Sequence, residues 1–270
     1  MKKAIVFAAA MLLSVGAFAQ NDLKKVNDVI EPLPGGSVTF NGYFADDIQS
    51  SIDRWVKGVM PYDKVIDFFV KGRPQFALGE MPGKSIRTNS LLYRYTQDPE
   101  LKELTKELVY KLMATERSNG SISCTTVDDQ PGDRDGDIWE RKYVMLGLLQ
   151  YYADVEQDPR VLSAVEKEAK SVIDQVGPAP KKGITQLGWS ATKIESSSIL
   201  EPMMRLYFIT GKQEYLKLVQ DRVDEYIELG LPEWTVNTCS MGHCLITLYE
   251  HTGDERYLNI AKSKVDYLEN

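Results

Sequence analysis

The sequence predicts an all-α protein built from stacked helical hairpins, because one pattern recurs four times along the chain. In each copy a helix-like segment ends with an aromatic residue, a short polar turn follows, and a second helix-like segment begins. The aromatic residues are Tyr93, Tyr152, Tyr207 and Tyr249, so the pattern recurs after 59, 55 and 42 residues. Repeats of this length built from helix, turn and helix are typical of solenoids and rings.

The turns inside the repeats also carry helix-start signals. Asp98 and Asp158 each stand immediately before a proline in the first two turns. Aspartate is a favourable N-cap, and proline is well tolerated at the first helical position. In the third and fourth turns, Thr210 and Thr252 are each followed by glycine. These four turns are short enough to join adjacent antiparallel helices.

The elements follow from apolar spacing, taken in chain order. Residues 20–45 form a polar linker with a short strand at 35–40, and residues 46–270 form the helical domain. Residues 72–84 hold three glycines and two prolines and are expected to be a loop. Strand-like fragments are expected near 119–123 and 182–185. The predicted helices are 48–59, 62–70, 85–96, 99–116, 137–154, 159–176, 195–210, 213–229, 236–252 and 254–268.

The connections between repeats are mostly longer than the turns inside them. They run roughly over 118–137, 177–193 and 229–236, and Trp139, Trp189 or Trp234 lies in or beside each one. In a ring or solenoid of hairpins these connections emerge on one side, and clustered long loops commonly carry binding and catalytic residues. We therefore expect the functional face on this side.

Composition restricts the cellular context and the partners. Residues 1–19 combine two lysines, an apolar run too short to span a bilayer, and a small-x-small site near Ala19, as in a secretory signal peptide. We expect a periplasmic or secreted protein. Without the two signal-peptide lysines the formal net charge changes from −7 to −9. An acidic chain with scattered lysines is a poor candidate for nucleic-acid binding, and protein partners are not indicated.

The densest acidic segment enters the predicted helix 137–154. Asp137, Trp139 and Glu140 lie at its start, where the helix dipole favours ionised carboxylates and a tryptophan can stack on a sugar ring. Sugar hydrolysis commonly uses two carboxylates. The alternative is structural, with Asp137 as N-cap and Glu140 closing a capping box. The spacing of the aspartates also suggests a calcium loop. An EF-hand loop has glycine at its sixth position and glutamate at its twelfth, but here those positions are Ile138 and Val144, so the match fails twice.

Two further groups could carry chemistry. Glu201 precedes Pro202 at a helix start, which is unusual for a surface residue, so we expect it to face a central cavity. Cys239 and His243 lie four residues apart, on one helix face, as two zinc ligands would. The better interpretation is that these residues are small side chains that pack an inner helix. Thiol catalysis by Cys239 or Cys244 would need a supporting base, and the sequence shows none. We predict no metal site.

Several segments together resemble glycoside hydrolase family 127, the β-L-arabinofuranosidase-like group. They are Trp139-Glu-Arg-Lys-Tyr through Tyr152, then Val176-Gly-Pro, then Ser196-Ser-Ser-Ile-Leu-Glu-Pro202 followed by Arg205-Leu-Tyr207. The likeness is closest to the divergent bacterial branch of the family and covers roughly residues 36–228. It implies an (α/α)6 toroid, usually followed by β-sandwich domains, and cleavage of furanosides from plant glycans. Because helices continue almost to Asn270, we expect the N-terminal part of such a toroid.

The resemblance also has a clear limit. The best-known members use a cysteine nucleophile among thiolate and glutamate zinc ligands, together with a separate glutamate acid. This chain has no Glu-x-Cys pair and no adjacent cysteines, and Trp139 stands where those members have a histidine. The resemblance therefore supplies no nucleophile, acid or zinc ligand. It gives counterparts for Asp137, Trp139 and Glu201 as substrate-cleft positions.

The sequence therefore favours an exported glycoside hydrolase-like protein that acts on plant-type oligosaccharides and could be inactive as a fragment. Asp137 and Glu201 are the candidate catalytic residues, and Trp139, Glu140 and Trp189 are the candidate substrate-binding residues. A non-catalytic carbohydrate-binding protein on the same scaffold is the alternative. A third hypothesis is a scaffold for protein partners, as helical repeats often are.

Overall fold

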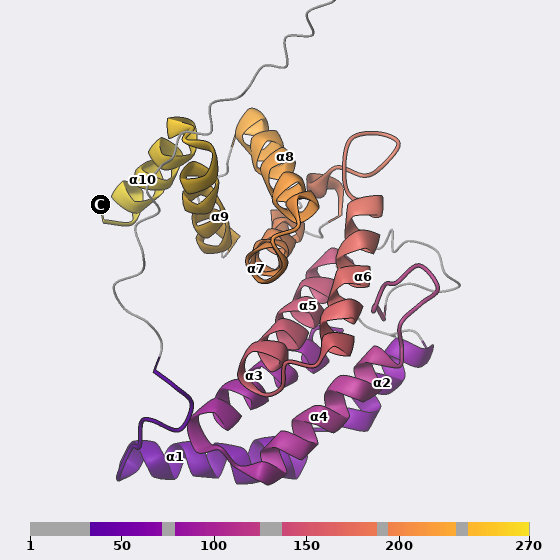
Figure 1. Cartoon of the computed structure of the whole chain (residues 1–270), viewed down its shortest axis with the longest axis vertical. Helices are drawn as coiled ribbons and strands as arrows, with labels where there is room; N and C mark the ends of the chain where they lie inside the picture. Colours follow the sequence, from indigo (N-terminus) through magenta and orange to yellow (C-terminus); the bar gives the residue numbers. More distant parts are fainter. Residues whose placement is uncertain (1–32, 72–78, 125–136, 188–193, 231–236, 270) are drawn as a thin grey trace, which may run out of the picture.

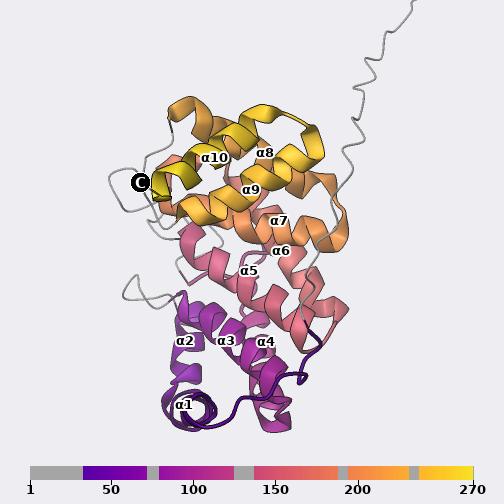
Figure 2. The same ribbon diagram turned by 90° about the vertical axis from the view of Figure 1, so that its left-hand side faces the viewer.

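The computed structural model describes residues 33–71, 79–124, 137–187, 194–230 and 237–269, and within them the protein is an all-α arc of helical hairpins. The four hairpins follow one another along the long axis of the molecule (Figures 1 and 2). They consist of α3 (Met81–Thr96) with α4 (Pro99–Met113), α5 (Asp137–Asp154) with α6 (Pro159–Gln175), α7 (Leu200–Thr210) with α8 (Gln213–Leu229), and α9 (Asn237–Thr252) with α10 (Glu255–Glu269).

The first helix of each hairpin packs against the first helix of the next. Thus α3 contacts α5, α5 contacts α7, and α7 contacts α9, while α4, α6, α8 and α10 each lie against their own hairpin partner. This inner and outer layering is that of an incomplete (α/α)6 toroid, as the sequence predicts. The central inner helix, α5, is buried over most of its length.

Two further helices precede the hairpins. α1 (Tyr43–Ser51) continues into a π-helix over Ile52–Val59, and α2 (Tyr62–Lys71) follows the break at Pro61. Their buried face contributes Val56, Val65 and Phe69, which pack toward α3 and α4. No helix of the described residues is both long and apolar enough to cross a membrane.

The predicted helix starts and turns inside the repeats are confirmed. Asp98 accepts hydrogen bonds from the backbone N–H groups of Glu100 and Leu101, and Asp158 accepts one from Arg160. Gly211 ends α7 in the left-handed conformation, with φ of 69°. A side chain there would meet the steric penalty that glycine avoids.

The short turns are also fastened to the neighbouring repeat. Lys57 Nζ lies 2.8 Å from the carboxylate of the cap Asp98, and hydrogen bonding to Lys57 lowers the pKa of Asp98. The Tyr110 hydroxyl on α4 donates to the cap Asp158 before α6. At the last repeat the hydroxyl of Tyr257, near the start of α10, donates to Asp224 in the second half of α8 over 2.8 Å. Each of these contacts ties a hairpin to the element that precedes it.

The first helix, α1, begins at Tyr43, five residues before the predicted start at 48 and inside the predicted linker. The structure differs from the predictions at three further places. Helix α3 begins at Met81 rather than 85, because Pro82 occupies the first turn, where its missing N–H is tolerated. The predicted helix 195–210 is a 3₁₀ segment, Ile194–Ile199, followed by α7. Pro202 cannot donate the hydrogen bond that would continue an α-helix upstream.

The third difference concerns the predicted strands. Residues 35–40 are irregular, and the Gly36 N–H donates to the carbonyl of Arg94 at the end of α3 instead of to a partner strand. Residues 119–123 form no strand, and near 182 the structure has a single bridge between Val176 and Lys182. Short extended fragments without a pairing partner cannot form a sheet.

Helices α3 and α5 approach each other unusually closely, through two glycines. A Cβ atom on Gly83 would overlap the backbone of Tyr143, and one on Gly147 would lie 2.5 Å from the carbonyl oxygen of Gly83. Small residues at such a contact allow two helix backbones to come together without a layer of side chains between them. The relative position of α3 and α5 therefore depends on these glycines.

We predict that Gly83→Ala and Gly147→Ala each lower the free energy of unfolding by about 1–3 kcal/mol or more, because the added methyl forces the backbones apart. Gly242→Ala on α9 is the matched control, since a Cβ there meets nothing within 4 Å. That change should stabilise the protein by up to about 1 kcal/mol through helix propensity. Urea unfolding measures all three, and equal effects at the three positions would contradict the close contact.

Candidate functional site

The inner helices present a cluster of charged and aromatic side chains near the ends where the long connections enter. We call it the inner-helix cluster. It consists of Glu80 just before α3, Lys84 and Arg87 on α3, Trp139, Lys142 and Tyr143 on α5, and Glu201 and Arg205 on α7. All are partly exposed except Lys142, whose relative exposure is 5%.

Trp139 is held by a contact between α5 and the start of α3. Its indole Nε1–H donates to Glu80 Oε2 over 2.6 Å, and Lys84 Nζ lies 2.7 Å from the other oxygen of the same carboxylate. Tyr143 packs edge-on against Trp139, with ring centroids 5.3 Å apart. The orientation of the tryptophan is therefore fixed by a carboxylate and a neighbouring ring.

Lys142 lies between the two aromatic rings. Its Nζ is 3.5 Å from the centroid of Trp139 and 3.6 Å from that of Tyr143. The pKa of Lys142 is lowered to about 7, mainly by burial and also by the positive charges of Lys84 and Arg87, against the opposing attraction of Glu201 and Glu80. A lysine that changes charge near neutral pH lies among candidate site residues, as perturbed groups often do.

Glu201 enters the cluster from the first turn of α7. Its Oε1 accepts a hydrogen bond from Arg205 Nη2 at 2.9 Å and lies 4.0 Å from Arg87 Nη2 on α3. Glu201 thereby connects α7 to α3, and its charge also acts on Lys142 of α5. The structure brings the predicted residues Trp139 and Glu201 into one region, and Trp189 lies outside the described residues.

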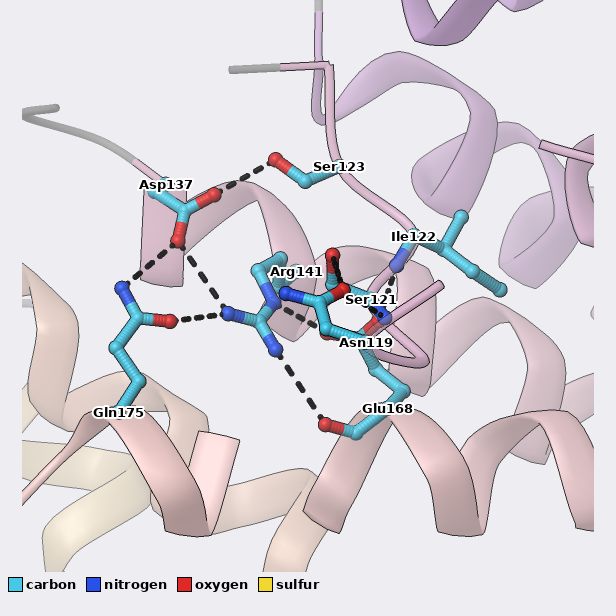
Figure 3. Close-up of polar contacts among 8 residues, drawn as sticks. All are labelled: Asn119, Ser121, Ile122, Ser123, Asp137, Arg141, Glu168 and Gln175. Carbon is cyan, nitrogen blue, oxygen red and sulfur yellow. Dashed lines mark hydrogen bonds and ion pairs between the residues drawn. The ribbon is translucent and has the colours of Figure 1, made fainter. Parts of the chain in front are cut away.

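Asp137 has a different environment, shown in Figure 3. It is fully buried, and its carboxylate accepts hydrogen bonds from Ser123 Oγ at 2.6 Å, Gln175 Nε2 at 3.2 Å and Arg141 Nη1 at 3.4 Å. These contacts are typical of a structural carboxylate. Because the residue before Asp137 lies outside the described part, the predicted capping box remains a prediction.

Arg141 is the centre of that buried network. Its guanidinium also contacts Glu168 on α6 and the Gln175 side chain at 2.5 Å, and Glu168 accepts the Ile122 N–H (Figure 3). Burial alone would lower the pKa of Arg141, but the charges of Glu168 and Asp137 raise it above its ordinary value. The network joins the segment before α5 to both helices of the second hairpin.

Glu140, a predicted substrate-binding residue, is also fully buried. The Cys124 thiol donates to its Oε2 at 3.2 Å, and a Cβ on Gly79 would overlap the carboxylate. Direct contact with a sugar needs an accessible carboxylate, so the described geometry favours a packing role. Its role as a substrate ligand remains a prediction.

Six members of the cluster were not predicted as site residues from the sequence: Glu80, Lys84, Arg87, Lys142, Tyr143 and Arg205. A signal was available, because Glu80, Lys84 and Arg87 lie four and three residues apart and share one face of α3. Charged residues on the face that an inner helix turns to its neighbours are unusual. Glu80, however, lies in a segment that composition assigned to a loop.

The described residues give no support to the zinc alternative. They contain no group of three or more His, Cys, Asp or Glu side chains able to hold a metal ion. His243 is exposed, and burial raises the pKa of the Cys244 thiol to about 12. The side chain of Cys239 and the proposed calcium loop lie outside the described residues.

The layered hairpins define the chain as an α/α-toroid protein. Residues 47–227 match the family described as β-L-arabinofuranosidase, GH127 catalytic domain. The chain belongs to this family. Residues 188–270 also match the description Glycosyl Hydrolase Family 88.

Two solved structures of family 127 enzymes align with the chain. A β-arabinofuranosidase aligns with 14% identity and a TM-score of 0.62 over 86% of this chain and 42% of its own. A β-L-arabinofuranosidase from Geobacillus stearothermophilus T6 aligns with 19% identity and a TM-score of 0.48 over 66% of this chain and 29% of its own. The chain thus spans less than half the length of either. Comparison with curated proteins gave no match.

Asp137→Asn tests the structural assignment of this carboxylate. We expect it to lower the free energy of unfolding by about 3 kcal/mol, because Arg141 would lose part of its buried counter-charge. Ser123→Ala, which removes a single hydrogen bond to Asp137, should cost about 1 kcal/mol. Chemical denaturation compares the two. Wild-type stability in Asp137→Asn would contradict the structural role and favour a catalytic one.

Lys142→Met tests the lowered lysine pKa. Between about pH 7 and 10.5 the unfolded chain binds the Lys142 proton more readily than the folded one, so wild-type stability should rise with pH. The variant lacks this dependence and should be more stable than wild type near pH 7 and below. The difference in the free energy of unfolding between the variant and wild type should shrink toward pH 10. Urea unfolding from pH 6 to 10 measures the difference, and a pH-independent difference would contradict the lowered pKa.

Proposed function

We propose that the inner-helix cluster binds a sugar and hydrolyses its glycosidic bond, with β-L-arabinofuranosidase-like activity on plant-type oligosaccharides. The observation that carries this proposal is the convergence of two partly exposed carboxylates, Glu80 and Glu201, with Trp139 on three neighbouring inner helices. Family membership supports the reaction class.

Sugar binding is assigned to Trp139. The apolar faces of sugar rings stack on aromatic rings, and a tryptophan held in one orientation loses little freedom on binding. The hydrogen bond to Glu80 and the edge contact with Tyr143 provide this orientation. Trp139 is partly exposed, as a stacking residue must be.

Glycoside hydrolysis needs one carboxyl group that donates a proton to the leaving oxygen and a second that acts as base or nucleophile. Glu201 and Glu80 are the accessible carboxylates of the inner-helix cluster. Arg205 holds Glu201, whereas Lys84 and Trp139 hold Glu80, so both have restricted positions before substrate binds. Groups fixed in advance lower the cost of reaching the transition state.

We propose no step through zinc. The described residues contain no cluster suited to a metal, and the Cys244 thiol, with its pKa of about 12, is a poor thiolate. The chemistry is therefore assigned to carboxylates. We also propose export after removal of residues 1–19, on the basis of their composition.

The test is hydrolysis of arabinofuranosides and of arabino-oligosaccharides by the purified chain, with and without a zinc chelator. Glu201→Gln should lower turnover by about 10²-fold or more with an unchanged melting temperature, because it removes a proton-transfer group. Glu228→Gln, on the exposed outer helix α8, is the matched control and should leave turnover unchanged.

Trp139 provides a second measurement. Trp139→Ala should weaken sugar binding more than Trp139→Phe, which keeps a ring and loses the indole hydrogen bond. Turnover that is insensitive to Glu201, or that disappears on chelation, would overturn the carboxylate assignment. Binding without turnover in any variant would support the alternative, a carbohydrate-binding protein without catalysis.

A further inference from the structure

We propose, on the basis of the proposed function, that Lys142 is a positioning residue: its buried positive charge holds the ring of Trp139 for sugar stacking, and sugar binding therefore depends on pH. The inference concerns the regulation of the proposed site, and Lys142 itself need not touch the sugar. It rests on the place of the ammonium group between two rings, on its burial, and on the charges around it.

The three residues share one side of α5. Lys142 lies three residues after Trp139 and Tyr143 lies four after it, which is the spacing at which helical side chains meet. The Lys142 ammonium is 3.5 Å from the centroid of the Trp139 ring and 3.6 Å from that of Tyr143, well inside the range of a cation–π interaction. The ring centroids are 5.3 Å apart, so the ammonium group attracts both rings at once.

This attraction adds to the contacts that orient the indole. Glu80 accepts the hydrogen bond from the indole Nε1–H at 2.6 Å. A hydrogen bond at the ring edge fixes the position of one atom, whereas an ammonium group over the ring face restrains the tilt of the plane. A ring whose tilt is restrained loses less freedom when a sugar stacks on it. Loss of the charge on Lys142 should therefore weaken sugar binding through Trp139.

The positive charge of Lys142 is easily lost because the group is buried. A relative exposure of 5% leaves an ammonium group little hydration. Burial, together with the charges of Lys84 and Arg87 from α3, lowers the pKa of Lys142 to about 7. The carboxylates that oppose this change are Glu201 on α7 and Glu80 just before α3. The charged form is therefore lost within the range of ordinary buffers.

The direction of the pH dependence follows from this titration. Lys142 is mostly charged at pH 6 and mostly neutral at pH 9, so the cation–π contacts exist at the lower pH. Burial raises the pKa of the Tyr143 hydroxyl to about 12, so this ring of the same helix does not ionise in between. Sugar affinity should therefore fall as the pH rises from 6 to 9.

The experiment measures binding of arabinotriose to the purified full chain by titration calorimetry at pH 6, 7.5 and 9. We expect the affinity of the wild type to fall about fivefold across this range, which is the effect expected when one cation–π contact is lost.

Variants assign the change to Lys142. Lys142→Met should bind about fivefold more weakly than wild type at pH 6, with no further change up to pH 9. Unfolding would not account for this loss, since the variant should be at least as stable as wild type at pH 6. Lys142→Arg keeps its charge at every pH used, so its affinity should be the same at pH 6 and 9. Lys170→Met, on the exposed face of α6, should behave as wild type.

Tryptophan fluorescence without sugar reports the contact itself. Subtracting the emission of Trp139→Phe from that of the wild type isolates Trp139 from the other three of the four tryptophans. We expect this difference to change in one step with a midpoint near pH 7, where Lys142 changes charge. The step should be absent when both proteins also carry Lys142→Met.

The outcomes separate the two proposals. Equal wild-type affinity at pH 6 and pH 9 overturns the positioning role and leaves the proposed function intact. A pH-dependent affinity or a fluorescence step that persists in Lys142→Met also overturns it, since another group would then be responsible. Absence of arabinotriose binding at every pH overturns both proposals.

Discussion

The close contact between α3 and α5 is the constraint on which the rest of the architecture depends. Gly83 and Gly147 let the two backbones touch, and this approach places Glu80 within hydrogen-bond distance of Trp139 and Lys84 against the ring of Tyr143 at 4.5 Å. Larger side chains at the two glycines would separate the helices and with them the carboxylate and the indole. The geometry of the cluster is therefore set by backbone packing, and its polar contacts follow.

Behind this contact, the buried Arg141 network provides rigidity. A guanidinium with two carboxylates and an amide around it has its charge compensated inside the protein and ties α5 to α6. Asp137 belongs to this network, and Glu140 is buried against Cys124, whereas Lys142 and Tyr143 contact Trp139 in the cluster. The first turns of α5 therefore contribute both to the buried structural network and to the cluster.

The sequence predicts the helices well because their signals are local. Aspartate–proline caps, threonine–glycine turns and apolar periodicity place the bounds of α5 and α8 at the observed residues. The site was harder to predict because it depends on contacts between helices. Trp139 is singled out by its place beside the acidic segment and Glu201 by the proline that follows it, but neither signal shows that Glu80 reaches Trp139 across 59 positions. Nor does composition reveal that Asp137 faces Arg141 instead of a cavity.

The fastening of the short turns has a consequence for how such a scaffold can diversify. The contacts of Lys57 with Asp98 and of Tyr110 with Asp158 tie successive elements together at the short-turn edge. At the opposite edge, where the crossovers run, the Arg141 network ties the segment before α5 to α6, and insertions outside that segment leave the contacts of the short turns in place. Insertions there can reshape ligand preference while the curvature of the arc is conserved, so that recognition and architecture can change independently in descendants of one ancestral gene.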